Sequence, residues 1–171
     1  MFFKVWFVAA IVTIVLTLSS GNVVPLQQCQ GESFEGLQDR IQVAPCAGKS
    51  TTTCKLQKNT NVTVTFEFTP DEDVNSLTNV VFAEIGGVPI PFFGVDGTDA
   101  CQHVKSVAAD EYVSCPLPAG QVYVYTNVFP ILPVYPTIST KVHWALKDGK
   151  KTQICFEIPA AITNAPKKSK N

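Results

Sequence analysis

Charged side chains are scarce in this chain of 171 residues, because Asp, Glu, Lys and Arg together make up only 16% of it. A disordered polyampholyte would carry many more charges and far fewer apolar residues, yet 46% of this chain is hydrophobic. Basic residues do not dominate either, since 13 Lys and Arg are balanced by 14 Asp and Glu. The composition therefore excludes disorder and argues against a nucleic-acid-binding surface.

Residues that carry catalytic or metal chemistry are also few. There are two histidines, His103 and His143, and neither has a carboxylate or a second histidine at metal-ligand spacing. The chain contains no G-x-S-x-G, G-x-G-x-x-G, P-loop or C-x-x-C motif. The acidic turn at 71–73 lacks the glycine and the closing glutamate of an EF-hand loop. We therefore expect two surface histidines, no catalytic residue, no metal and no cofactor.

Long hydrophobic runs are absent except near the start of the chain. Lys4 precedes an apolar run from Val5 to Leu18, which ends at small residues up to Gly21. A membrane span needs about 20 apolar residues, so this run is short for an anchor. A charged start, an apolar core and a small-residue exit are typical of a secretory signal peptide. We expect residues 1–21 to be such a signal and the protein to be secreted, with a membrane anchor as the alternative.

All the cysteines lie after the predicted signal. An even number of cysteines in a secreted chain predicts disulfides formed in an oxidising compartment. Three bridges would use all six: Cys29, Cys46, Cys54, Cys101, Cys115 and Cys155.

Alternation of apolar and polar residues is the main local pattern after position 21. Val62, Val64 and Phe66 alternate with threonines, which is the period expected of a half-buried strand. Trp144 and Phe156 lie in two similar stretches near the end of the chain, joined by an Asp-Gly turn that favours a hairpin. Weaker strand candidates lie at 37–43, 77–85 and 121–128, with a short extended piece at 88–93. These stretches predict an all-β sandwich of about seven strands.

Two proline-spaced apolar segments, at 86–94 and 128–136, lie where loops are usually polar. Prolines remove backbone donors and keep the chain extended, which suits an edge strand or the wall of a pocket. From composition alone, both segments could equally fill the core. Residues 164–171 have few apolar side chains and are expected to form a disordered basic tail.

Several short motifs add a resemblance that covers nearly the whole chain from Cys29 to Ile162. They are Val43-Ala44-Pro45-Cys46, Asn61-Val62-Thr63-Val64-Thr65-Phe66, Gly87-Val88-Pro89-Ile90-Pro91-Phe92, Tyr123-Val124-Tyr125, Val134-Tyr135-Pro136, Val142-His143-Trp144 and Cys155-Phe156-Glu157-Ile158-Pro159. With six cysteines in register, the chain resembles the Niemann-Pick type C2-like members of the secreted ML-type lipid-recognition domain family.

The resemblance implies an immunoglobulin-like β-sandwich of about seven strands, spanning residues 22–163, with an apolar cavity between its two sheets. It also implies that Cys29 pairs with Cys155, Cys46 with Cys54, and Cys101 with Cys115.

The resemblance further implies a lipid-binding and transfer protein that is not an enzyme and that holds a cholesterol-like sterol in the cavity. It places the mouth of the cavity at Val43, Phe92, Ile131 and Tyr135. It places the deeper lining at Val62, Val64, Phe66, Val124, Val142, Trp144 and Ile158.

The chain departs from the sterol carriers of this family near the expected mouth. Phe92 is followed by Phe93-Gly94 instead of further prolines, and 129–135 is wholly apolar where the vertebrate carrier has charges. A carrier of fatty acids or small apolar semiochemicals is therefore an alternative, as is an innate-immune protein that recognises bacterial lipids.

Partners and destination are expected by the same analogy. We expect a monomer that meets a membrane sterol transporter or a membrane surface. Asn61-Val62-Thr63 is an acceptor sequence for an N-linked glycan. The expected location is extracellular, with the lysosomal lumen as the alternative.

Overall fold

The computed structural model of this chain describes residues 26–46 and 52–165. The predicted signal at 1–21 and the residues of the tail from 166 onward lie outside the described residues. Within the described ranges, no helix is both long enough and apolar enough to cross a membrane.

The strand predictions with the clearest alternation are confirmed. Strand β4 runs from Asn61 to Phe68, and its side chains are buried at every second position, beginning with Val62. Strands β10 (Ser139–Asp148) and β11 (Lys151–Thr163) form the expected antiparallel hairpin. Gly149 has a φ of 56° in the turn between them, a conformation that glycine adopts without steric cost.

The first sheet is built around that hairpin. Its strands follow the order β1, β11, β10, β5 and β6, where β1 spans Gln27–Gln28, β5 spans Thr78–Ile85 and β6 spans Val88–Pro91. Strand β3 (Cys54–Gln57) pairs in parallel with the end of β11. Strand β6 forms an edge, and its two prolines leave few backbone donors for a further strand.

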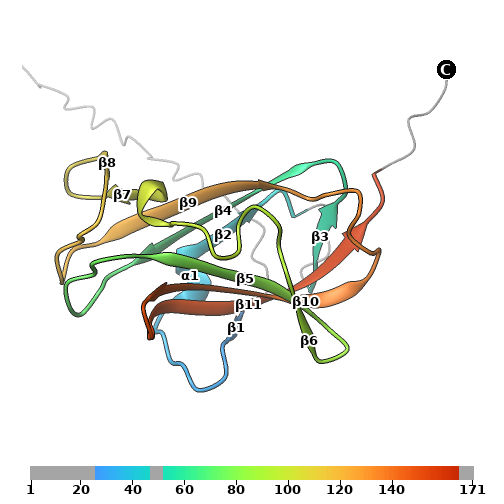
Figure 1. The fold of residues 1–171 in the computed structure, drawn as a ribbon, viewed down its shortest axis with the longest axis horizontal. Coiled ribbons are helices and arrows are strands. Elements are labelled where there is room, and N and C mark those ends of the chain that lie inside the picture. The colour runs from blue at the N-terminus through green and yellow to red at the C-terminus, as the bar shows by residue number, and fades with distance from the viewer. Residues whose placement is uncertain (1–25, 47–51, 166–171) are drawn as a thin grey trace, which may run out of the picture.

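The second sheet has the order β2, β4, β9, β7 and β8. Strand β9 runs from Tyr123 to Pro130 and pairs with β4 along its whole length. The remaining strands are β2 (Ile41–Ala44), β7 (Val104–Ser106) and β8 (Glu111–Val113). The two sheets lie one above the other (Figure 1), which confirms the predicted all-β sandwich.

Local structure differs from the predictions in two places. The described residues contain eleven strands instead of about seven, because pieces of two to four residues such as β1 and β8 carry no periodic pattern. Residues 37–43 do not form one strand, since Leu37–Arg40 is a helical turn, α1, ahead of β2. Leu37 and Ile41 are four positions apart, so their spacing fits a helical turn as well as a strand. A 3-10 turn, η1, covers Cys101–His103.

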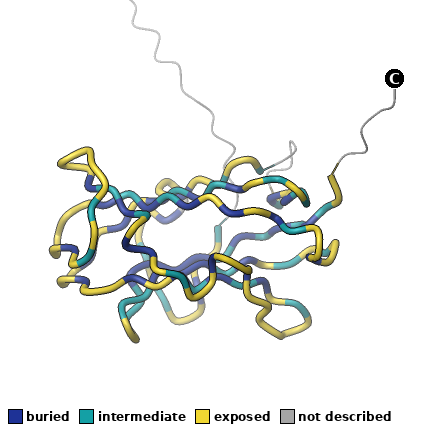
Figure 2. The backbone as a smooth tube through the Cα atoms, turned by 45° about the horizontal axis from the view of Figure 1, so that its top comes forward, coloured by how far each residue is buried: buried dark blue, intermediate teal, exposed yellow. Residues whose placement is uncertain are grey.

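The core lies between the sheets, where buried residues line the inward faces of both layers (Figure 2). Aromatic rings occupy its centre. Phe66 stacks on Tyr125 with ring centroids 4.8 Å apart, and the ring of Phe156 meets Phe66 edge-on at 5.3 Å. Rings packed in these arrangements gain about 0.5–1.5 kcal/mol per pair beyond the area that they bury.

The three disulfides have the predicted pairing. Cys29 is joined to Cys155, Cys46 to Cys54, and Cys101 to Cys115. The first bridge joins residues 126 positions apart and fastens the N-terminal segment to β11, whereas the other two close loops of 8 and 14 positions.

Loss of the long-range bridge should destabilise the fold most. The double substitution Cys29→Ser, Cys155→Ser is expected to lower the free energy of unfolding by about 4 to 5 kcal/mol, because the unfolded chain gains the entropy of a long open loop. Urea denaturation of the oxidised protein measures this change. The matched control Cys101→Ser, Cys115→Ser should cost about 3 kcal/mol, and an equal or larger loss in the control would contradict the entropic explanation.

Candidate functional site

Apolar side chains from both sheets surround a small space inside the sandwich, which we call the slot. Strands β2, β4 and β9 contribute from one sheet, and β3, β10 and β11 from the other. Ten residues line it: Val43, Cys54, Leu56, Val62, Val64, Phe129, Val142, Trp144, Ile158 and Ala160. None of these side chains is charged, so the slot suits an apolar molecule and offers nothing for acid–base chemistry.

The slot is nearly closed. Its volume is about 10 Å³, which is at most the room of a single water molecule. Apolar side chains gain by contacting each other, so the walls of the slot pack close together. A guest larger than water must therefore move the walls apart, and it regains the lost contacts by making its own.

A second apolar space lies beside β6, and we call it the crevice. It is also about 10 Å³ in volume and is lined by Ala83, Ile85, Ile90, Pro91, Phe92, Tyr135, Pro136 and Ile162. Two ring contacts join the crevice to the slot: Phe92 meets Phe129 edge-on at 5.8 Å, and Phe129 lies 5.4 Å from Trp144. Phe92 and Phe129 therefore form the partition between the two spaces.

Tyr135 is held at the crevice by its neighbours on two sides. Its ring meets Phe92 at 5.3 Å and stacks on Phe93 at 6.2 Å. Its hydroxyl oxygen accepts a hydrogen bond from the backbone N–H of Phe93, at 3.0 Å. Burial raises the pKa of the Tyr135 hydroxyl, so it stays protonated near neutral pH.

The two proline-spaced segments both fill the core and border the crevice. Phe92, Phe129, Ile131 and Tyr135 are buried, whereas Val88, Phe93, Val128 and Val134 are between 55% and 74% exposed. The sequence left open whether these segments fill the core or form the wall of a pocket. Both interpretations hold, because each segment has buried residues in the core and other residues that border the crevice or face the solvent.

Most of the predicted site residues lie together in the structure. Six of them line the slot: Val43, Val62, Val64, Val142, Trp144 and Ile158. Phe92 and Tyr135 line the crevice. Phe66 and Ile131 are fully buried in the same core cluster but line neither space.

Val124 is placed elsewhere. The inward residues of β9 are Tyr123, Tyr125 and Phe129, so the period of two puts Val124 on the opposite, outer face of that strand. The next outer position, Thr126, bonds to the outer Thr65 of β4 with 3.2 Å between the hydroxyl oxygens. Val124 therefore does not face the slot.

Four residues of the slot were not predicted: Cys54, Leu56, Phe129 and Ala160. Alternation along β9 could have identified Phe129, and alternation continued past Ile158 could have identified Ala160. Leu56 carries no such pattern, because β3 is only four residues long and reaches the slot by pairing with the end of β11.

Strand β8 lies at the end of the sandwich away from β3 and β6 (Figure 1). Residues of β8 and its neighbours line a wider groove. Its volume is about 450 Å³, and its lining mixes polar residues such as Ser106 and Gln121 with Tyr112 and Pro116. None of the predicted site residues lines it, and Tyr112 is 70% exposed. We regard it as a surface depression separate from the slot.

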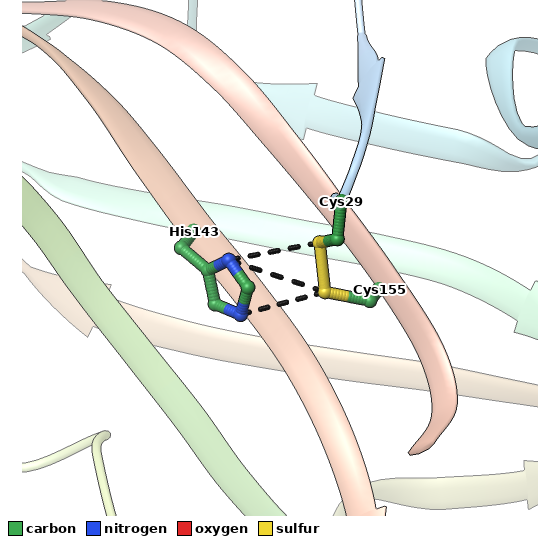
Figure 3. Close-up of side chains that lie close together, drawn as sticks. All are labelled: Cys29, His143 and Cys155. Carbon is green, nitrogen blue, oxygen red and sulfur yellow. Dashed lines mark hydrogen bonds between the residues drawn. A yellow bond between two sulfur atoms is a disulfide. The ribbon is translucent and has the colours of Figure 1, made fainter. Parts of the chain in front are cut away.

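On the outer face of the first sheet, His143 lies against the long-range disulfide (Figure 3). Its Nε2 is 3.4 Å from the sulfur of Cys155, and its Nδ1 is 3.6 Å from the sulfur of Cys29. One donor atom from each of the three residues falls within 4.8 Å of the others, a spacing that a metal ion could bridge. The two sulfurs are bonded to each other, however, and metal binding by cysteine needs a free thiolate.

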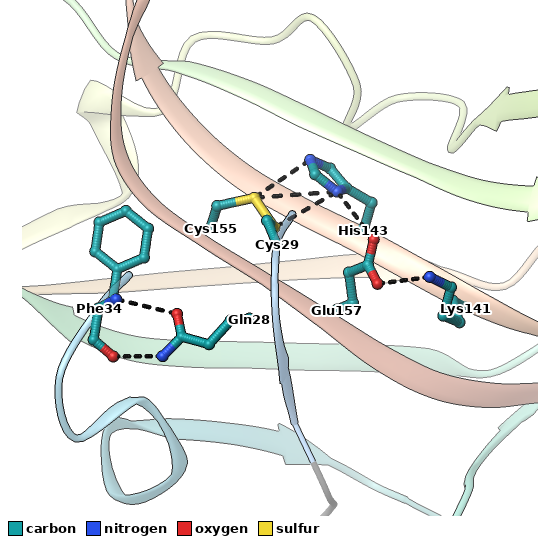
Figure 4. The surroundings of a disulfide bond; sticks show 7 residues. All are labelled: Gln28, Cys29, Phe34, Lys141, His143, Cys155 and Glu157. Atoms are coloured by element: carbon teal, nitrogen blue, oxygen red, sulfur yellow. Dashed lines mark hydrogen bonds and ion pairs between the residues drawn. A yellow bond between two sulfur atoms is a disulfide. The ribbon is translucent and has the colours of Figure 1, made fainter. Parts of the chain in front are cut away.

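His143 is also packed against residues from neighbouring strands (Figure 4). Its ring stacks on Phe82 of β5, with centroids 4.4 Å apart. Figure 4 shows its Nδ1 beside Glu157, 3.7 Å from a carboxylate oxygen. Glu157 accepts a hydrogen bond from the Lys141 ammonium at 2.7 Å. The expectation of a surface histidine is therefore wrong for His143, whose side chain is only 18% exposed.

Comparison with known proteins identifies the fold family. The model of the ML domain matches residues 23–162, which is most of the chain. The chain belongs to the ML domain family. The resemblance inferred from the sequence motifs is thereby confirmed.

Relatives of this ML domain include proteins from vertebrates and insects. It is 29% identical over 159 residues to the NPC intracellular cholesterol transporter 2 of Mus musculus, covering 92% of this chain and 99% of the mouse protein. It is 37% identical over 109 residues to the ecdysteroid-regulated 16 kDa protein of Manduca sexta, covering 64% of this chain and 70% of the other.

A solved structure shares the fold. The crystal structure of a Niemann-Pick type C2 protein from the Japanese carpenter ant matches with a TM-score of 0.59 and 24% identity, over 72% of this chain and 89% of the ant chain.

The burial of His143 predicts that acid destabilises the ML domain. Burial lowers the pKa of His143, an effect that Glu157 opposes and that Lys147 and Lys141 reinforce. Below about pH 6.5 the unfolded chain therefore binds a proton at this position more readily than the folded one, so stability falls as the pH drops.

Urea denaturation between pH 7.5 and pH 5 checks this expectation. His143→Gln should show a smaller fall in the free energy of unfolding over that interval than the wild type. Identical pH profiles for the two proteins would show that His143 contributes nothing to the acid sensitivity.

Proposed function

We propose that this ML domain is a secreted carrier, not an enzyme, that holds a sterol in the slot between its sheets. The observation that carries the proposal is the slot itself, whose ten lining residues come from both sheets and include no charged side chain. Relatives named as cholesterol transporters in Mus musculus and Drosophila melanogaster support the choice of a sterol.

The energetics of an apolar guest fit this proposal. A ligand that buries about 400 Å² of apolar surface gains on the order of 10 kcal/mol before the costs of association are subtracted. Part of that free energy is spent on moving the walls of the slot apart, because the slot has a volume of only about 10 Å³. Submicromolar affinity is the expected net result, with few hydrogen bonds required.

A fatty acid or small apolar semiochemical is the second candidate. The closed slot favours it, because a narrow, flexible chain needs less separation of the sheets than a rigid ring system does. The bacterial-lipid alternative has no comparable observation in its favour.

Transfer of the ligand requires a route past Phe92 and Tyr135. Exposed apolar side chains surround the crevice, including Phe93 at 60% and Val134 at 74% exposure. We propose that this rim contacts a membrane surface or a membrane sterol transporter while the ligand moves, with the protein acting as a monomer.

Filling the slot should prevent ligand binding. Val43→Trp places a large ring where a half-buried valine of the edge strand β2 now lines the slot. We expect binding of cholesterol or oleic acid to weaken by at least about tenfold, equivalent to about 1.4 kcal/mol. A direct binding titration measures the loss, and native mass spectrometry with lipid identification shows which apolar compound the wild-type protein retains.

The matched control is Val128→Trp on the outer face of the same sheet, where the side chain is 56% exposed. It should bind as the wild type does. A wild-type protein that carries no lipid and takes up neither cholesterol nor oleic acid would overturn the carrier proposal, and a retained fatty acid would replace the sterol.

Secretion and glycosylation form a separate prediction. Asn61 is exposed at the start of β4, so an N-linked glycan attached there can project into the solvent. Protein expressed in insect cells should appear in the medium with its N-terminus after Gly21, and peptide-N-glycosidase should lower its mass. Asn61→Gln should lack that mass difference, and an unshifted wild type would show that the site is unused.

A further inference from the structure

A series of hydrogen bonds joins the two sheets inside the sandwich. The hydroxyl of Tyr125 on β9 donates to the side-chain oxygen of Asn79 on β5, at 2.6 Å, and the amide of Asn127 donates to the same hydroxyl oxygen, at 2.9 Å. Strands β5 and β9 belong to different sheets and lie in different layers (Figure 1). We call these three side chains the polar chain, and its bond between Tyr125 and Asn79 crosses the interior from one layer to the other.

The polar chain is buried and paired. Its three side chains are at most 7% exposed. The amide of Asn79 also donates to the hydroxyl of Thr98, at 3.1 Å, and the backbone N–H of Asn79 donates to the carbonyl of Thr98, at 2.9 Å. Burial raises the pKa of the Tyr125 hydroxyl, so the hydroxyl keeps the proton that it donates. Separating the two sheets here would leave buried donors and acceptors unpaired, which is costly.

Along β5, the polar chain lies at the end of the slot away from the crevice. The inward residues of this strand are Ala83, which lines the crevice, then Val81, and then Asn79. Val81 is the register partner of Trp144, which belongs to the wall of the slot. Crevice, slot and polar chain therefore follow one another along the strand.

Strand β9 gives the same order. Phe129 lines the slot, and the next inward residues towards the start of the strand are Asn127 and Tyr125. Asn127 is the register partner of Val64, which lines the slot, and the ring of Tyr125 meets Trp144 edge-on at 6.2 Å. The polar chain is thus the next layer of the interior beyond the slot.

The two layers are held together differently at the slot and at the polar chain. The walls of the slot meet through apolar side chains, and a guest replaces those contacts with contacts of its own. A hydrocarbon tail offers no donor or acceptor, so it cannot replace the hydrogen bonds of the polar chain. An apolar guest should therefore separate the sheets at the slot and leave them joined at the polar chain.

We propose that the polar chain is the inner stop of the slot and sets the longest apolar tail that the protein accepts. The inference rests on the carrier function proposed above and defines its ligands by size. Ala83 and Asn79 are four positions apart on β5, which is about 13 Å at the rise of an extended strand. CH₂ groups beyond that depth have to bend back or stay outside, so they add little to the affinity.

Affinities of ligands with graded tails test the limit in the wild-type protein. One series is the saturated fatty acids lauric, myristic, palmitic, stearic, arachidic and behenic acid. The other is a set of 3β-hydroxysterols whose unbranched side chains lengthen by two CH₂ groups at a time. Each buried pair of CH₂ groups should raise the affinity by about tenfold, whereas a pair beyond the stop should change it by less than about twofold. We expect affinities that rise and then level off, measured by competition against a fluorescent fatty acid or sterol.

An apolar replacement of the polar chain should move this limit. The triple variant Asn79→Leu, Tyr125→Phe, Asn127→Leu exchanges all the partners for apolar side chains of similar shape, a change that can be nearly neutral for stability. The hydroxyl of Thr98 keeps its bond to the carbonyl of Val95, at 2.6 Å. The first ligand beyond the wild-type limit should bind the variant about tenfold more tightly than it binds the wild type. Tyr125→Phe alone, which loses one hydroxyl, gives the same comparison with the smallest change.

The matched control is Thr65→Val, Thr126→Val. It removes a hydrogen bond of 3.2 Å between two strands of the second sheet, on the outer face. Its limit should equal that of the wild type. A loss of stability alone would weaken all members of a series by a similar factor, so the tail length at which affinity levels off separates an inner stop from a merely structural role. Urea denaturation shows whether each variant is folded.

The outcomes distinguish this inference from the proposed function. Affinities that rise through the longest member of both series would overturn the inner stop while the carrier function stands. The same holds if folded variants without the polar chain level off at the wild-type length. If the wild type binds no member of either series, the carrier function itself fails, and the length limit fails with it.

Discussion

Burial of one face of each sheet against the other is the constraint on which the rest of this structure depends. Buried and less buried side chains alternate along β4, β5 and β9, so each sheet has an apolar inner face. Aromatic residues of β4, β9, β10 and β11 meet between the layers. Where the inner side chains are large rings, as at Phe66 and Tyr125, the interior is filled. Where they are mainly valine and isoleucine, beside Trp144, the sheets close on each other and leave the slot.

The row of rings from Tyr135 through Phe92 and Phe129 to Trp144 connects the surface to that interior. Edge-on ring contacts are weak individually, so they can be exchanged for contacts with a guest at little net cost. The side chains of Asn79, Tyr125 and Asn127 are joined by buried hydrogen bonds. Breaking these bonds would leave several buried polar groups unpaired, which is costly. We therefore expect the sandwich to open at the aromatic row and to stay closed at the polar chain.

The outer face of the first sheet has a structural role. The bridge between Cys29 and Cys155 fastens the N-terminal segment over β11, and Phe34 packs against the small cluster around it. The side chain of Gln28 exchanges two hydrogen bonds with the backbone of Phe34, at 2.7 and 3.0 Å, which holds the segment in place. His143 is covered as a result, and its protonation is coupled to the stability of a face that lies opposite the slot.

The sequence by itself determined the class of fold and most of the slot. Val62, Val64 and Trp144 could be assigned to the interior because strand alternation is a local property, and the family motifs supplied the disulfide pairing. Alternation also contained the information that Val124 faces outward, since it is out of phase with Tyr123 and Tyr125. Only the tertiary structure decided the rest. Leu56 reaches the slot through a parallel pairing of distant segments, and the side chain of His143 is partly covered by Cys29, 114 positions earlier in the chain. These are relations between residues far apart in the chain, and no local pattern encodes them.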